Sequence, residues 1–207
     1  MNRVPDAMEP VLGWRAWALA ALREDSDGPT PAIALKSVTR PQEPWPAGRP
    51  AVAGCHLGHE APGGACTCGI HAFRHATDLR TVFPPDLLDA PPTVVGPVLG
   101  WGRVAMHERG WRAKFAYPEA FALVCARCLA GGQMVKTAAV AISRHWGIVV
   151  GCCAECGGNA ATSPGRFHAS DVLQALCSRY GVPPILIGAP APIAAGDTSS
   201  LVDQDAR

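Results

Sequence analysis

The feature that most limits how this chain can fold is a pair of Cys-x-x-Cys motifs separated by 24 residues. A tight turn places thiols at positions i and i+3 on one side of the backbone, so each motif can supply two corners of a tetrahedron with sulfur atoms about 3.7 Å apart. Two such motifs at this separation are typical of a four-thiolate zinc site. The first predicted metal ligands are Cys125, Cys128, Cys153 and Cys156.

Cys152 directly precedes the second motif and is not predicted to be a ligand. Neighbours in an extended strand point to opposite faces, so we interpret Cys152 as a small buried hydrophobic residue. A pairing of Cys152 with Cys156 remains the alternative. A thioredoxin-like redox motif would need a strand-to-helix junction, and neither Cys-x-x-Cys is predicted to open a helix. The pattern therefore favours metal binding over redox chemistry.

A second cluster of cysteines and histidines lies between residues 55 and 71. A proline and two glycines between His59 and Cys66 allow this loop to fold back on itself. The four predicted ligands of a Cys3His site are Cys55, His59, Cys66 and Cys68. The alternatives to His59 are His56, His71 and His75. We expect the Glu60 carboxylate to be solvated.

Each predicted site has four protein ligands, which is typical of structural rather than catalytic zinc. The prediction is one or two Zn²⁺ ions, with iron as the alternative metal. An open catalytic site would instead use His56 or His71, fewer cysteines and Glu60 as the base. The sequence contains no phosphate-binding loop, no G-x-S-x-G elbow and no H-E-x-x-H motif. It therefore offers no enzyme signature, and a zinc hydrolase is kept as an alternative.

The composition indicates a reducing compartment and a neutral surface. The chain of 207 residues has nine cysteines and a net charge of +1, and its N-terminus lacks the apolar core of a secretory signal. We therefore expect a cytoplasmic protein with reduced thiols. No run of 18 apolar residues is present, which argues against a membrane partner.

The chain has 22 glycines and 20 prolines, which favours turns and short strands over long helices. We predict an α+β, mainly β fold. The clearest hairpin is 94–117, with its turn at 107–110 and one face formed by alternate residues from Val98 to Met106. Residues 12–22 and 32–38 are predicted to form a second hairpin. The alternative prediction is a short helix over 15–22.

The C-terminal part is predicted to contain a hairpin over 134–150 and a helix over 168–180. The hairpin turns near Arg144 and brings the second Cys-x-x-Cys back to the first. Ser170 is the expected N-cap of the helix, and Gly181 ends it. A final strand is predicted at 184–188. The predicted organisation is a flexible tail at 1–10, a β-rich domain at 11–121, a ribbon plus helix at 122–188 and a disordered tail at 189–207.

Basic and aromatic residues are interleaved on the 94–117 hairpin. Proteins bind single-stranded nucleic acid by combining aromatic stacking with positive charge. The residues concerned are Arg103, Arg109, Trp111, Arg112 and Lys114. The alternative interpretation is a solvated outer face with the tryptophans in the core, and the neutral net charge favours it. The predicted partner is a protein or a nucleic acid that binds through this local surface.

Residues 123–158, with two Cys-x-x-Cys motifs and a hairpin between them, resemble zinc-ribbon modules. The runs HEAPGGACTCGIHAF and GWGRVAMHERGWRAKFAYPEAF also resemble a pattern found in bacterial, especially actinobacterial-type, proteins. The ribbon resemblance implies a zinc-stabilised binding or regulatory protein, including a nucleic-acid-associated one. The alternative is a thiol-based redox or metal-responsive sensor.

Overall fold

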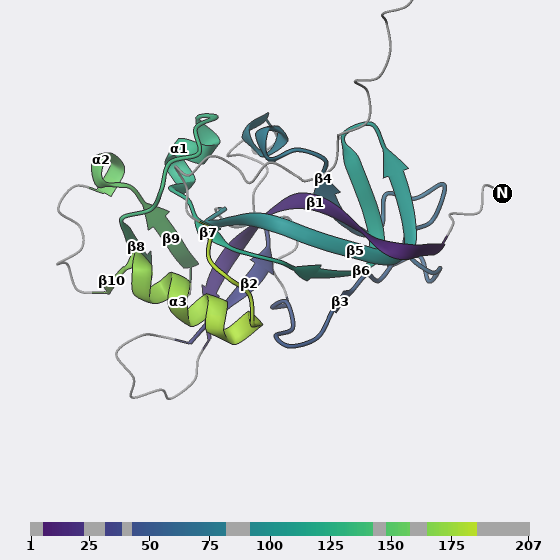
Figure 1. The fold of residues 1–207 in the computed structure, drawn as a ribbon, viewed down its shortest axis with the longest axis horizontal. Coiled ribbons are helices and arrows are strands. Elements are labelled where there is room, and N and C mark those ends of the chain that lie inside the picture. The colour runs from purple at the N-terminus through teal and green to yellow at the C-terminus, as the bar shows by residue number, and fades with distance from the viewer. Residues whose placement is uncertain are drawn as a thin grey trace, which may run out of the picture.

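The computed structural model describes residues 6–22, 32–38, 43–81, 92–142, 148–157 and 165–185. These residues are mainly β, as predicted, and ten strands form one sheet (Figure 1). The strands are β1 Asp6–Ala21, β2 Ile33–Ser37, β3 Ala51–Val52, β4 Ile70–Phe73, β5 Val94–His107, β6 Gly110–Pro118, β7 Ala122–Leu123, β8 Ala139–Ile142, β9 Ile148–Cys152 and β10 Arg166–His168. The helices are the 3-10 helix η1 Ala76–Thr81 and the α-helices α1 Ala126–Ala130, α2 Ala154–Gly157 and α3 Ala169–Tyr180.

Four of the strands close into a small barrel. β1 pairs with β5, β5 with β6, β6 with β4, and β4 returns to β1 through Trp14 and Phe73. β3 adds to this circuit by pairing with β6, and β2 adds by pairing with β1. The loop 53–69, which contains the first cysteine cluster, therefore begins and ends on strands that both pair with β6.

The two predicted N-terminal hairpins are present. β1 and β2 pair antiparallel, so residues 15–22 are strand and the alternative short helix is wrong. β5 and β6 pair with the predicted turn, because His107 faces Gly110. The predicted inward face holds from Val98 to Val104, both of which are buried, and fails only at its last residue, Met106. The register shifts between Trp101 and Val104, and Met106 is 58% exposed.

The hairpin predicted over 134–150 corresponds to β8 and β9, which pair antiparallel. Its predicted turn near Arg144 lies outside the described residues. β9 also pairs with β1, and Figure 1 shows α1 and α2 grouped beside β8 and β9 at one end of the molecule. The second Cys-x-x-Cys is therefore brought back toward the first, while β1 attaches this end to the barrel.

Helix α3 follows β10 without a connecting loop and ends at Gly181, whose left-handed φ of 66° suits glycine. The prediction that Ser170 is the N-cap is wrong, because His168 occupies that position without a side-chain cap. The helix begins where β10 ends, so the sheet rather than a capping hydroxyl sets its start. Of the predicted strand 184–188, Pro184 bridges Phe121, and residues 186–188 lie outside the described part.

The main core joins the barrel to α3 through large aromatic side chains. Trp17 is fully buried and contacts the Phe121 ring edge-on, and Phe121 contacts Tyr180 in the same way. The Tyr180 hydroxyl donates to the Trp45 carbonyl at 2.9 Å and accepts from the Leu35 N–H at 3.0 Å. Satisfied polar groups and aromatic packing thus attach the last helix to the first strands.

The predicted boundary between residues 121 and 122 stays a prediction, although β1 and β9 pair across it. β1 begins at Asp6, inside the predicted N-terminal tail, and the predicted tail 189–207 lies outside the described residues. Among the helices that the structure describes, none has the length and apolar character needed to cross a bilayer.

Candidate metal centres

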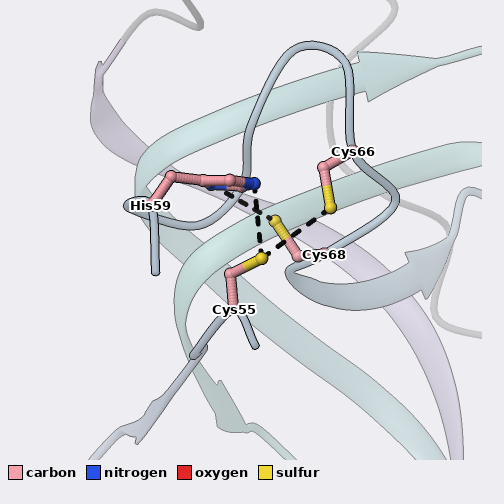
Figure 2. Close-up of side chains that lie close together, drawn as sticks. All are labelled: Cys55, His59, Cys66 and Cys68. Carbon is pink, nitrogen blue, oxygen red and sulfur yellow. Dashed lines mark hydrogen bonds between the residues drawn. The ribbon is translucent and has the colours of Figure 1, made fainter. Parts of the chain in front are cut away.

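The loop between β3 and β4 brings Cys55, His59, Cys66 and Cys68 together, with all four donor atoms within 4.8 Å of one another. We call this cluster the first centre (Figure 2). The Cys55 Sγ lies 3.3 Å from the His59 Nε2 and 3.8 Å from the Cys66 Sγ. These spacings suit donors around one tetrahedral ion. His56, His71 and His75 are not part of the cluster.

The His59 ring is oriented by a backbone group. Its Nδ1 lies 3.1 Å from the carbonyl oxygen of Glu60, which can only accept a hydrogen bond. Nδ1 therefore carries the proton and donates it, which leaves the lone pair of Nε2 directed at the cluster. A hydrogen bond from the second ring nitrogen is the usual way in which a metal-binding histidine is fixed.

Backbone amides stabilise negative sulfur in the first centre. The N–H of Cys68, with a further contribution from His59, lowers the pKa of the Cys66 thiol to about 7. The Gly63 N–H donates to the Cys68 Sγ at 3.3 Å, although burial raises the pKa of that thiol. An amide directed at sulfur favours the thiolate, which is the form that binds metal.

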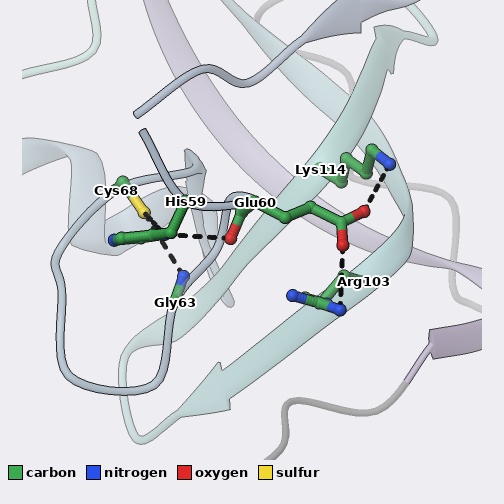
Figure 3. A network of polar contacts seen from close by, with 6 residues as sticks. All are labelled: His59, Glu60, Gly63, Cys68, Arg103 and Lys114. Atoms are coloured by element: carbon green, nitrogen blue, oxygen red, sulfur yellow. Dashed lines mark hydrogen bonds and ion pairs between the residues drawn. The ribbon is translucent and has the colours of Figure 1, made fainter. Parts of the chain in front are cut away.

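The first centre is attached to the barrel by charged side chains of β5 and β6. The Arg112 guanidinium donates to the carbonyl oxygens of Cys66 and Cys68. The Glu60 carboxylate pairs with Arg103 at 2.9 Å and Lys114 at 2.5 Å (Figure 3). Glu60 is therefore ion-paired rather than simply solvated, which corrects our expectation.

These ion pairs also affect the acidity of Glu60. The Lys114 hydrogen bond and the Arg103 charge lower the pKa of the Glu60 carboxyl below its ordinary value. A general base for hydrolysis needs the opposite shift, toward neutral pH.

The other cysteine cluster, the second centre, contains Cys125, Cys128, Cys153 and Cys156, with their sulfur atoms within 4.8 Å of one another. The Cys128 Sγ lies 3.7 Å from the Cys153 Sγ and 3.6 Å from the Cys156 Sγ. These distances match the edge of a zinc–thiolate tetrahedron, about 3.7 Å. All nine cysteines carry free thiols, so no disulfide competes with this arrangement.

Each Cys-x-x-Cys of the second centre forms one helical turn. Cys125 is the N-cap of α1, and α2 begins directly after Cys153. Our expectation that neither motif opens a helix is therefore wrong. Both helices are single short turns, and each places its two thiols beside those of the other motif. This geometry suits metal binding more than a redox pair at the start of a long helix.

Amide donors surround the sulfur atoms of the second centre as well. Burial alone would raise the pKa of the Cys125 thiol, but the N–H groups of Cys128 and Cys153 outweigh it and lower this pKa to about 7. The neighbouring thiolate of Cys125 raises the pKa of Cys128. Sulfurs this close cannot all be ionised in the absence of a cation, because their charges repel one another.

Cys152 lies in β9 opposite Ala139 and is not part of the second centre. It is half-buried, and burial raises the pKa of its thiol, which disfavours the thiolate needed for metal binding. The alternative pairing of Cys152 with Cys156 is therefore not the one that the structure forms.

The two centres differ in exposure. In the first, His59 is exposed, Cys55 and Cys66 are half-buried, and Cys68 is buried. In the second, Cys125 is 0% exposed and Cys153 is 5% exposed. Reagents in solution can thus reach the first centre more readily than the second.

Gly63 is predicted to control the affinity of the first centre for metal. A Cβ at Gly63 would lie 2.5 Å from the His59 Cε1, so Gly63→Ala must displace the imidazole. We expect zinc to bind the first centre about 10–100-fold more weakly, as when other groups that position a ligand are altered. Competition with a chromophoric chelator measures this affinity. Gly54→Ala is the matched control because a Cβ there meets nothing within 4 Å. Equal affinity in both variants would contradict the prediction.

Sequence reasoning missed the residues that attach the first centre to the barrel. From the sequence alone, Arg112, Arg103 and Lys114 are predicted only as a surface for an external partner. Their contacts with residues 60–68 join positions more than 40 apart in the chain. No local motif signals such a pairing. The single charge of Glu60 within an otherwise uncharged loop was the one available hint.

Comparison of the chain with protein-family models, curated proteins and solved structures finds no match.

Proposed function

We propose that this chain is a zinc-stabilised binding or regulatory protein in which both centres hold structural Zn²⁺. The observation that carries the proposal is the convergence of two sets of four donors, one within a single loop and the other from two distant Cys-x-x-Cys motifs. Soft thiolate donors within 4.8 Å of one another suit zinc better than magnesium or calcium, which take oxygen ligands. The second centre is proposed to be of the zinc-ribbon type.

A structural role is favoured over hydrolysis by the number of donors. Four protein ligands fill a tetrahedral zinc ion and leave no position for the water that a zinc hydrolase activates. At the first centre, the Glu60 carboxylate is paired with two cations and is not available as a free base. The metal ions would therefore hold loops in place for contact with a partner.

A second candidate function, a thiol-based sensor, is favoured by the exposure of the first centre. The Cys55 and Cys66 sulfurs lie 3.8 Å apart and are half-buried. Hydrogen peroxide would accept two electrons from these thiolates and be reduced to water as they form a disulfide. Loss of two ligands would release the metal from this centre.

Metal content measured before and after mild oxidation tests both functions. We expect protein purified under reducing conditions to contain two zinc ions per chain by elemental analysis. Retention of both ions after peroxide treatment supports purely structural centres, and loss of one supports the sensor. A chain that folds without zinc, or that contains iron in its place, contradicts the proposal.

A further inference from the structure

Glu60 connects the first centre to the basic hairpin. Its carbonyl oxygen fixes the His59 ring, and its carboxylate binds Arg103 and Lys114 (Figure 3). A single residue therefore touches both the metal-ligand side chain and two cations of β5 and β6. Any change that moves the loop must also uncover these cations.

The metal-loaded loop and the hairpin carry charges of opposite sign. A zinc ion with three thiolates and a neutral imidazole carries a net charge of −1, and Glu60 adds another. Arg103, Arg112 and Lys114 supply three positive charges, all in contact with the loop. The metal-loaded loop thus neutralises most of the positive field of the hairpin.

The loop depends on its metal to stay in this position. Its ion pairs are partly exposed, with 47% of the Glu60 side chain accessible, and exposed ion pairs contribute little to stability. Without the cross-link among its four ligands, the ordering of a loop with several glycines is opposed by chain entropy. Release of the metal would therefore free both the loop and the three cations.

We propose that the first centre controls access to a nucleic-acid-binding surface formed by Arg103, Arg112 and Lys114. With zinc bound, the loop covers and neutralises this surface; without zinc, the surface is open. This regulatory mechanism depends on the zinc site proposed above, because binding and release of that zinc ion would determine whether the surface is covered.

Single-stranded nucleic acid is the partner that the surroundings of these cations favour. The Lys114 Nζ lies 5.1 Å from the centroid of the Phe115 ring, and the Trp101 ring lies 6.2 Å from that of Phe115. Both aromatic side chains are half-buried and so keep part of their surface accessible. Aromatic rings beside cations bind bases by stacking and phosphates by charge, whereas an acidic peptide would use only the charge.

Fluorescence anisotropy with a labelled single-stranded DNA oligonucleotide tests the proposal on the full chain. Glu60→Gln removes the neutralising carboxylate but keeps the carbonyl that orients His59. We expect it to retain two zinc ions and to bind the probe at least threefold more tightly than the wild type in low salt. Cys66→Ser should lose one zinc ion and bind about tenfold more tightly. Both gains should disappear in high salt.

Glu119→Gln is the matched control, because it removes the same charge from an exposed residue outside the loop. Adding Arg103→Gln and Lys114→Gln to Glu60→Gln should abolish the gain. Wild-type affinity in both Glu60→Gln and Cys66→Ser would overturn the proposal even if zinc is present. Equal competition by polyglutamate would overturn the choice of nucleic acid. Absence of zinc from the wild type would instead contradict the proposed metal centres.

Discussion

Cys153→Ser is expected to remove one zinc ion and to lower the free energy of unfolding by more than about 4 kcal/mol. Cys153 is 5% exposed, and its sulfur lies 3.7 Å from that of Cys128. Metal binding and folding are coupled at such a site, so the loss of one ligand should also disorder β8, β9 and the short helices α1 and α2. Elemental analysis and equilibrium denaturation with urea measure the two effects.

Cys152→Ser provides the control, since it changes the same atom one residue earlier. Cys152 is outside the second centre, so we expect two zinc ions and a much smaller loss of stability. The reverse order of the two variants would show that the ligands of this centre are assigned wrongly. Loss of zinc from both would show that β9 tolerates no change beside the site.

Gly96→Ala is expected to destabilise the barrel by about 3 kcal/mol or more, because the added methyl group has no room. A Cβ at Gly96 would lie 2.0 Å from the carbonyl oxygen of Ala120, and a backbone atom cannot move aside as a side chain can. Gly96 pairs with Arg15 of β1, so a shift would disturb the longest strand pairing in the sheet. Thermal and urea denaturation measure the loss.

Gly54→Ala is the control for this substitution as well. Gly54 is exposed, and a Cβ there meets nothing within 4 Å. Since the methyl group also reduces the entropy of the unfolded chain, we expect stability within about 1 kcal/mol of the wild type. Comparable losses in the two variants would show that crowding at Ala120 is not the cause.

Local patterns in the sequence predicted local structure well. Alternation and a glycine turn indicated the β5–β6 hairpin, and Gly181 indicated where helix α3 ends. The predicted inward face of β5 continues to Val104, which is buried, but Met106 at the end of the strand is 58% exposed. The closed barrel was not predicted, since pairings such as Trp14 with Phe73 depend on long-range packing rather than on local propensity.

The candidate ligands could be predicted because the short spacings between these cysteines and histidines are typical of metal-binding sites. Cys-x-x-Cys fixes the geometry of two thiols without reference to the rest of the fold, and all eight predicted donors lie in two clusters. The choice of His59 over His56 could not be made from spacing. It depends on the Glu60 carbonyl, which holds one ring nitrogen, and on the close approach of Gly63 to the ring.

Strand β1 pairs with β2, β4, β5 and β9, so a single stretch of 16 residues borders both halves of the protein. Protein fragments that end near residue 121 would lack Tyr180, which belongs to the same core cluster as Trp17. They would also lack β9, which pairs with β1. Such fragments should aggregate rather than fold. Laboratory work on either centre is therefore best done by point substitution in the intact polypeptide.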